Sequence, residues 1–195
     1  FNCNLSEGTI FNILNRAYDS LETTENEIKN RLLESPQIHA DETGIYVEKL
    51  RQWLFSYSNK NYTFYDFHKK RGKEAMDFIG FMENYRGIVT HDCWKTYEAY
   101  ENCLHSFCNA HFLRELNGIM ETTEFKFPKE IKETLLSMKN LVDTGESISK
   151  EVKDSMISLY HSQLNKGFEE ELNTNPPSLT KTGKQGRRKQ SPAKN

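Results

Sequence analysis

Two acidic residues lie where the sequence pattern predicts β-strands. Asp41 is inside "HADETGIYVEKL", residues 39–50, and Asp92 ends the short apolar run "GIVTHD", residues 87–92. Strands disfavour Asp, and a carboxylate beside a core is costly unless its charge is compensated. Two neighbouring carboxylates repel each other and need a cation, for which Mg²⁺ or Mn²⁺ is the natural choice. We therefore predict that Asp41 and Asp92 are metal ligands; the alternative is that Asp41 caps a turn before Gly44 and Asp92 caps the next helix.

A second group of potential ligands follows the second acid. Cys103, His105, Cys108 and His111 carry the side chains that zinc prefers. The group lacks a C-x2-C pair, and a strand would point alternate residues to opposite faces, so a zinc site is not expected. Cys108 and His111 could also form a nucleophilic pair, but nothing nearby supplies a third, orienting group. We predict that these two make packing and hydrogen-bond contacts beside the active centre.

Basic residues gather in two places. Lys69, Lys70, Arg71 and Lys73 follow the third predicted strand, and six Lys and Arg residues, without any acid, lie in residues 180–195. These positions could contact a DNA backbone. The candidates in the tail are Arg187, Arg188 and Lys189. The alternative is a solvated loop and a disordered linker.

The elements that would position these residues can be predicted from hydrophobic periodicity. Strands are expected over three consecutive stretches, then at the two later apolar runs, with helices between and after them. The expected strands are residues 37–48, 51–58, 62–67, 87–92 and 104–111. The expected helices are residues 10–21, 25–33, 75–82, 94–100, 112–120 and two more around 131–142 and 152–168. The order β-β-β-α-β-α-β-α predicts an α/β fold with a mixed sheet, in which the first and fourth strands commonly lie side by side.

The chain as a whole divides into four predicted segments. They are an N-terminal helical segment (1–35), a partial catalytic core (36–120), a helical insertion (121–172) and a basic Pro/Gly/Ser/Lys-rich linker (173–195). No run of 18 apolar residues predicts a membrane span. Four cysteines in 195 residues are too few for a disulfide framework and favour reduced thiols in a cytosolic protein. The lack of an initial Met and of a signal peptide suggests a piece of a longer protein.

Six blocks of sequence, taken in order, resemble the catalytic region of the IS66 family of insertion-sequence transposases. They are "HADETGIYV", "WLFSYS", "TFYDF", "RGKEAMDFI", "YRGIVTHDCWKTYE" and "CNAHFLREL". The resemblance implies a DDE-type enzyme with an RNase H-like fold, in which Asp41 matches the first acid and Asp92 the second. Cys108 and His111 match a Cys-x-x-His pair of the family. "HDCW" departs from the usual Asp-Gly-Tyr context, and the block that carries the third acid, a Glu, is not found.

The resemblance also implies a function. We expect a DNA transposase fragment that cleaves and transfers DNA strands with two Mg²⁺ or Mn²⁺ ions in its complete site, and that is inactive by itself without the third acid. Its partners would be element-end and target DNA and further copies of itself, near the nucleoid in a bacterial cytoplasm. Two alternatives stay open: an inactive remnant that only binds DNA or a partner, and an RNase H-like hydrolase that acts on RNA.

Overall fold

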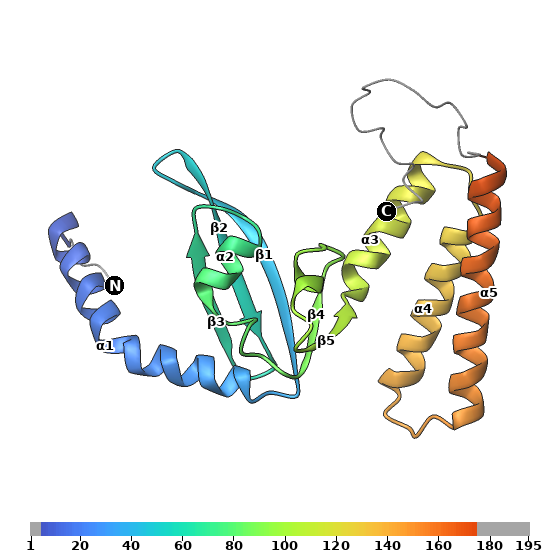
Figure 1. The fold of residues 1–195 in the computed structure, drawn as a ribbon, viewed down its shortest axis with the longest axis horizontal. Helices are drawn as coiled ribbons and strands as arrows, with labels where there is room; N and C mark the ends of the chain where they lie inside the picture. The colour runs from blue at the N-terminus through green and yellow to red at the C-terminus, as the bar shows by residue number, and fades with distance from the viewer. Residues whose placement is uncertain (1–4, 175–195) are drawn as a thin grey trace. The chain divides into compact units, whose positions relative to one another are not determined.

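The computed structural model describes residues 5–174 of the 195, which form two compact units (Figure 1). The chain passes from the first unit to the second between Cys108 and Asn109. The first contains a long helix, α1 (Glu7–Leu33), and a five-stranded sheet, and the second is helical. The four segments predicted from the sequence do not coincide with these two units, since the predicted core, residues 36–120, extends past Cys108, and they stay a prediction.

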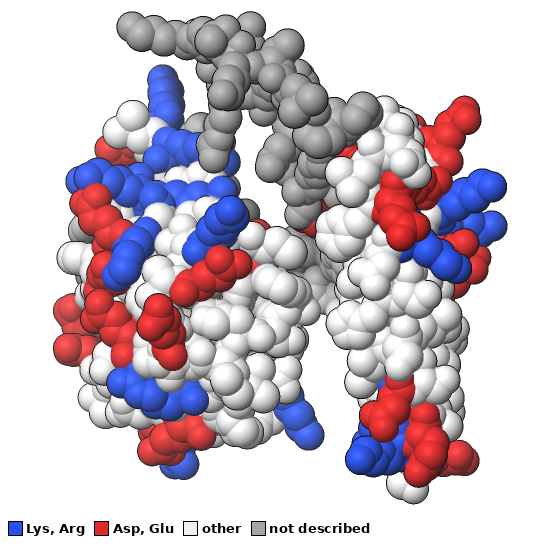
Figure 2. Space-filling model, turned by 45° about the vertical axis from the view of Figure 1, so that its right-hand side comes forward, with Lys and Arg blue, Asp and Glu red and all other residues white. Residues whose placement is uncertain are grey.

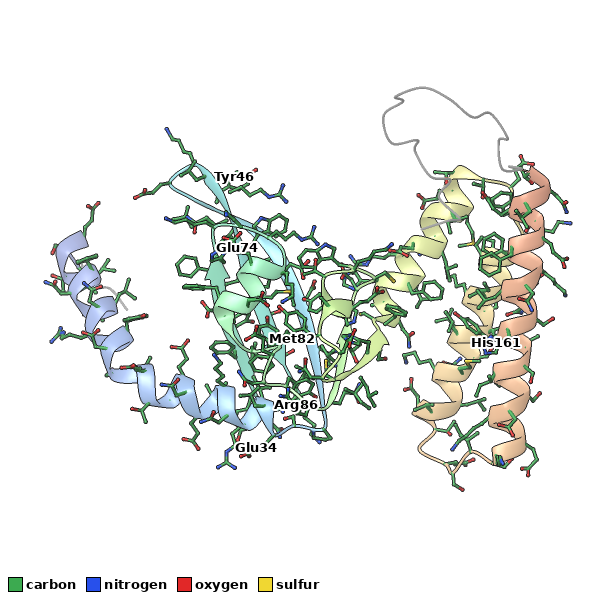
Figure 3. The ribbon with its side chains drawn as sticks, in the orientation of Figure 1. Glu34, Tyr46, Glu74, Met82, Arg86 and His161 are labelled. Atoms are coloured by element: carbon green, nitrogen blue, oxygen red, sulfur yellow. The ribbon has the colours of Figure 1, made fainter. Side chains whose placement is uncertain are left out.

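The sheet of the first unit is mixed, as the sequence predicts. Its order is β3-β2-β1-β4-β5, where β1 to β3 form an antiparallel meander and β4 and β5 run parallel to β1. The strands are β1 (Gln37–Val47), β2 (Leu50–Ser58), β3 (Thr63–His68), β4 (Ile88–His91) and β5 (Leu104–Phe107). Glu48 and Lys49 join β1 to β2 with positive φ angles of 51° and 66°, the conformation that a two-residue hairpin needs. Beside this turn Tyr46 is exposed (Figure 3).

One face of the sheet carries the core of the first unit. Alternate strand residues, such as Ile38 in β1 and Phe55 in β2, pack against α2 (Lys73–Ile79), the end of α1 and the segment that follows α2. Tyr57 stacks on Phe81 with 4.2 Å between ring centroids, and Met82 is fully buried inside the unit (Figure 3). This face therefore holds α2 and the loop after β4 at fixed positions against β1.

Several element boundaries differ from the prediction. The two helices expected over 10–21 and 25–33 are one helix, because residues 9–33 contain no Gly or Pro to end the first. α2 ends at Ile79, since Gly80 takes a left-handed φ of 65°. The helix expected over 94–100 is a single 3₁₀ turn, η1 (Tyr97–Ala99). β5 ends at Phe107 and the next helix already begins at Asn109.

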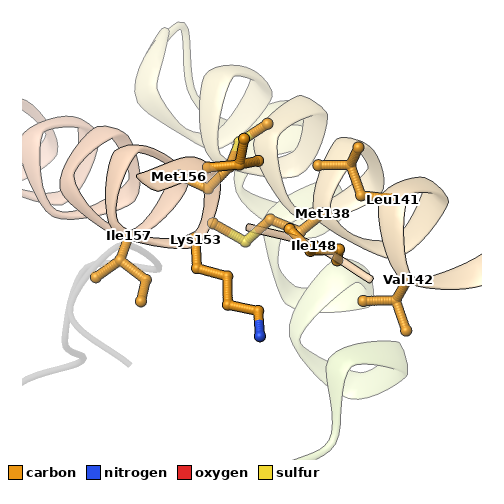
Figure 4. A pocket seen from close by; sticks show the side chains of 8 residues that line it. Met138, Leu141, Val142, Ile148, Lys153, Met156 and Ile157 are labelled. Atoms are coloured by element: carbon orange, nitrogen blue, oxygen red, sulfur yellow. The ribbon is translucent and has the colours of Figure 1, made fainter. Parts of the chain in front are cut away.

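The second unit is formed by α3 (Asn109–Thr122), α4 (Phe127–Asp143) and α5 (Lys150–Thr174). Leu116, Ile119 and Ile131 lie in its core. A Cβ added at Gly167 of α5 would be 2.7 Å from the ring of Phe127, so the glycine allows α5 to approach α4 closely. Side chains of α4, α5 and the loop between them line an apolar pocket of about 220 Å³ (Figure 4). None of the helices within residues 5–174 is long and apolar enough to cross a membrane.

Candidate functional site

The strands that carry the two candidate ligands are neighbours. β1 and β4 pair in parallel, with His39 opposite Thr90 as the last matched pair. Asp41 lies two residues after His39, within β1, and Asp92 lies two residues after Thr90, directly after the end of β4. Because strand residues two apart point to the same face, this register assigns Asp41 to the face of His39. Asp92 lies beyond the end of β4, and its charge acts on Glu42 and Tyr97. Whether the two carboxylates share an ion stays a prediction.

Asp41 is exposed, whereas the sequence analysis expected its carboxylate to lie beside the core. Its side chain does not lie against the core, so no buried charge has to be compensated there. Oδ1 of Asp41 accepts the backbone N–H of Glu42 at 2.9 Å, and its carbonyl oxygen accepts the Ser56 hydroxyl at 3.2 Å. Within residues 5–174 no Lys or Arg forms an ion pair with Asp41 or Asp92. In this part of the chain, neither carboxylate is therefore neutralised by a basic side chain.

Asp92 is half-buried and fixed by the loop that it begins. Its Oδ1 accepts the backbone N–H of Trp94 at 2.9 Å, a local turn bond typical of Asp. Its carbonyl oxygen accepts a hydrogen bond from Nδ1 of His91. Asp92 caps no helix, because the helix expected over 94–100 is a 3₁₀ turn whose N-cap is Thr96, without a side-chain cap bond. The bond from Trp94 orients the carboxylate of Asp92.

The buried carboxylate of this region is Glu42, which the sequence analysis did not single out. Its side chain is 1% exposed. Oε1 accepts hydrogen bonds from Nε of Arg71 at 3.0 Å and Nη2 of Arg71 at 2.5 Å, and Oε2 accepts the Tyr97 hydroxyl at 2.8 Å. Burial raises the pKa of Glu42, with a smaller contribution from the charge of Asp92, while Arg71 and Tyr97 act in the opposite direction.

The guanidinium of Arg71 is held by aromatic rings as well as by Glu42. Its Cζ lies 4.1 Å from the ring centroid of Trp94 and 4.7 Å from that of Trp53. Arg71 thereby connects β1, β2 and the loop after Asp92. A planar cation that bonds a carboxylate and stacks on indoles is not interchangeable with Lys. We call Glu42, Arg71, Tyr97, Trp53 and Trp94 the arginine clamp.

Two histidines form a second buried contact next to Asp92. His91 is 1% exposed, and its Nε2 lies 2.9 Å from Nδ1 of His105. Nε2 of His105 is 3.0 Å from the carbonyl oxygen of Tyr100. The ring of His91 also stacks on Tyr97, at 4.5 Å between centroids. Burial is the main cause that lowers the pKa of His91. The pair therefore packs the end of β4 against the arginine clamp.

A comparison with family models identifies the chain. The model described as the Transposase IS66 family matches residues 1–191. The chain belongs to the IS66 family of transposases. This confirms the resemblance seen in the six sequence blocks and supports a transposase-related function. The searches of curated proteins and of solved structures gave no match.

In this IS66 family chain, the predicted DNA-contact residues differ in their availability. Arg71 belongs to the arginine clamp, whereas Lys70 pairs with Glu74 at 2.9 Å and Lys73 with Asp77 at 2.7 Å. Lys69 is exposed and forms no ion pair within the described part of the chain. Figure 2 shows basic and acidic side chains in small mixed groups on the face that it presents. The tail residues Arg187, Arg188 and Lys189 lie outside the described residues, and the DNA-contact role of both basic groups stays a prediction.

The cysteines and histidines that follow Asp92 in this IS66 family chain make separate local contacts. Cys103 Sγ lies 3.8 Å from Nε2 of His105, while Cys108 is bonded through its backbone N–H to the carbonyl oxygen of His91 at 2.7 Å. His111 lies in the first turn of α3. Across residues 5–174, no group of three or more His, Cys, Asp and Glu residues is placed to hold a metal ion. The family role of Cys108 and His111 stays open, as does the position of the third acid.

Proposed function

We propose that the sheet unit of this chain is the RNase H-like core of a DNA transposase, with Asp41 and Asp92 as two of its catalytic carboxylates. The observation that supports the proposal most strongly is the parallel pairing of β1 with β4. It aligns an exposed Asp in the first strand with an Asp that directly follows the fourth. The strand order with β1 at the centre of a mixed sheet is compatible with the element order expected for such a core. Membership of a transposase family makes DNA the expected partner.

The residues present fit part of a divalent-metal site. Carboxylate oxygens without a basic partner are the ligands that Mg²⁺ and Mn²⁺ prefer. Asp41 and Asp92 meet this condition in the described residues, and a third acidic ligand is still needed from elsewhere. When bound, two such ions would activate the attacking oxygen and stabilise the leaving oxygen.

The proposed reaction has two phosphoryl-transfer steps. Water attacks the phosphorus of the phosphodiester at the element end, the bond to the 3′-oxygen breaks, and a 3′-hydroxyl and a 5′-phosphate result. The 3′-hydroxyl then attacks the phosphorus of a target phosphodiester. A new phosphodiester bond joins the element strand to the target strand, and the target's 3′-oxygen leaves as a 3′-hydroxyl. Asp41 and Asp92 would hold the divalent cations, whose positive charge would offset the negative charge of the reacting phosphate. The bond from Trp94 to Asp92 and the arginine clamp hold these acids in place, which matters because misplacement of about 1 Å can cost about 100-fold in rate.

A second candidate function is a DNA-binding or interaction module without catalysis. It is favoured by the observation that residues 5–174 contain no group of three potential ligands. Phosphate contacts from Lys69 and its neighbours would not require the metal. On this reading the chain by itself binds DNA weakly and does not cleave it. Action in a bacterial cytoplasm, as a multimer on paired element ends, belongs to the proposal in either form.

A cleavage and strand-transfer assay on element-end DNA distinguishes the two. The 195-residue chain and the full reading frame are each assayed with Mg²⁺ and with Mn²⁺. The catalytic proposal expects activity in the full reading frame that is lost in both Asp41→Asn and Asp92→Asn. Asp154→Asn, at an exposed position of α5, is the matched control and should keep full activity. Metal-dependent cleavage that survives Asp92→Asn would refute the assignment of the site.

A further inference from the structure

The N-terminal part of α1 carries an apolar face that nothing in the described structure covers. Six large apolar residues on it are 43–78% exposed: Ile10, Phe11, Ile13, Leu14, Tyr18 and Leu21. The end of the same helix is anchored differently. Leu32 is fully buried, Ile28 and Leu33 pack on the core, and Nζ of Lys29 donates to the carbonyl oxygen of Ile79 at 3.0 Å. α1 is therefore fixed to the sheet unit at one end and extends away from it at the other (Figure 1).

The spacing of this face is that of a helix that packs against another helix. Residues 10, 14, 17, 21, 24 and 28 alternate in steps of four and three, and the first four are Ile, Leu, Ala and Leu. The opposite side is polar throughout. It carries Asn12, Asn15, Arg16, Asp19, Glu22, Thr23 and Asn26. Such a clean division over four turns, with the apolar side in solvent, indicates a missing partner surface.

We infer that this face, over residues 7–24, is a docking surface for the same segment of a second copy of the chain, in antiparallel orientation. Acidic residues decide the orientation. Asp19, Glu22, Glu25 and Glu27 lie in residues 19–27 without any Lys or Arg, whereas residues 6–18 carry only Glu7 and Arg16. A parallel pair brings the two acidic stretches side by side, where like charges repel. An antiparallel pair places each acidic stretch against the neutral half of its partner.

The antiparallel register pairs apolar side chains across the interface, and two of the four pairs below match a large side chain with a small one. A twofold axis between residues 15 and 16 sets Leu14 against the partner's Ala17 and Ile10 against the partner's Leu21. Tyr18 then meets the partner's Ile13, and Phe11 the partner's Ser20. The six exposed apolar side chains would bury about 600 Å² on each copy, estimated from about 100 Å² for each half-exposed large side chain. The total of about 1,200 Å² is at the lower end of specific interfaces, so the dimer should be concentration-dependent.

This inference is independent of the catalytic proposal, because it uses no residue of the candidate site. The first test is sedimentation of the full 195-residue chain over a range of concentrations. We expect a monomer–dimer equilibrium with a dissociation constant on the order of micromolar. Leu14→Glu should raise this constant at least about 30-fold, as for a central interface residue. Asn15→Glu adds the same side chain one residue away on the polar side and should change it less than threefold, a factor within ordinary surface effects.

Circular dichroism measures the helix content of both variants, which should equal that of the wild type. A change in the dissociation constant then reflects the interface and not unfolding. A photo-cross-link supplies the orientation and does not depend on either variant. With p-benzoylphenylalanine in place of Phe11, irradiation should give a covalent dimer in which the modified peptide lies within residues 17–24 of the second copy. A monomeric chain at about 100 µM, far above the expected constant, would overturn the inference. So would a cross-link to residues 8–14 of the second copy, to the helical unit, or only within one chain.

Discussion

Asp41 and Glu42 are consecutive residues of β1 with opposite environments: Asp41 is exposed, whereas the Glu42 side chain is 1% exposed and bonded to Arg71 and Tyr97. Alternation along a strand sends the two carboxylates to opposite faces of the sheet. The exposed acid is free to act on a ligand. The buried acid ties the strand to the loop that follows Asp92. Asp41 is thus a candidate metal ligand, and Glu42 supports the loop that follows Asp92, the second candidate.

Removal of the buried acid should destabilise the first unit. Glu42→Ala leaves the Arg71 guanidinium without its carboxylate and the Tyr97 hydroxyl without its acceptor, and the loss of hydrogen bonds to a charged group typically costs about 1.5–3 kcal/mol. Glu48→Ala, at the exposed β1–β2 turn, is the control and should cost less than about 0.5 kcal/mol. Urea unfolding followed by Trp fluorescence measures both. Equal losses for the two variants would show that the clamp does not stabilise the fold.

Much of the sheet could be predicted from the sequence, because the signals were local. Runs rich in aromatic and β-branched residues, separated by polar turns, indicated β1 to β3, and the apolar run at residues 87–92 indicated β4. The neighbouring position of β1 and β4 followed from the order of elements. The family assignment came from six blocks whose order is specific, and the family match confirms it.

The arginine clamp could not be predicted, because its members are far apart in the chain and meet only in the folded unit. Glu42 and Arg71 are 29 residues apart, and Glu42 and Tyr97 are 55 apart. A charged residue beside Asp41 gave no signal that it faces the core. Trp53 and Trp94 are half-buried and contact both the core and Arg71. One signal was available: the strand alternation places residue 42 on the side of Ile38 and Ala40, both apolar.

Gly87 should not tolerate a side chain. A Cβ at this position would lie 2.3 Å from the Tyr85 hydroxyl and 2.7 Å from the carbonyl oxygen of Pro36, and both groups are fixed, because the hydroxyl bonds the carbonyl oxygens of Ser35 and Ile88. We expect Gly87→Ala to lower the free energy of unfolding by about 1–3 kcal/mol through overpacking. Gly118→Ala in α3, where a Cβ meets nothing within 4 Å, should be neutral or stabilising. Thermal unfolding of the two variants tests the difference, and a neutral Gly87→Ala would contradict the packing described.

Asp77 should make the first unit sensitive to acid. Hydrogen bonds from Lys73 at 2.7 Å and from the Tyr100 hydroxyl at 2.6 Å hold the pKa of Asp77 below its usual value of 3.8. A lowered pKa in the folded state stabilises the fold above the unfolded-state pKa, and this contribution is lost as the pH falls through the folded-state pKa. The stability difference between the wild type and Asp77→Asn should therefore be constant near neutral pH and shrink below about pH 3.8. Chemical denaturation at several pH values measures it; a difference that stays constant down to pH 2 would contradict the linkage.

Lys69 should contribute more to DNA binding than the basic residues around it. Its ammonium group forms no ion pair within residues 5–174, whereas Lys70, Arg71 and Lys73 are each paired with an acid that a phosphate would have to displace. If Lys69 contacts one phosphate, Lys69→Ala should reduce the slope of log K against log salt by about 0.9 and weaken binding equally on all duplex sequences. Lys49→Ala, in the β1–β2 turn, removes the same charge at another exposed position and should leave the slope unchanged. Fluorescence anisotropy with a labelled duplex, titrated between low and moderate salt, measures both slopes. Equal slopes for wild type and Lys69→Ala would remove Lys69 from the proposed contact surface.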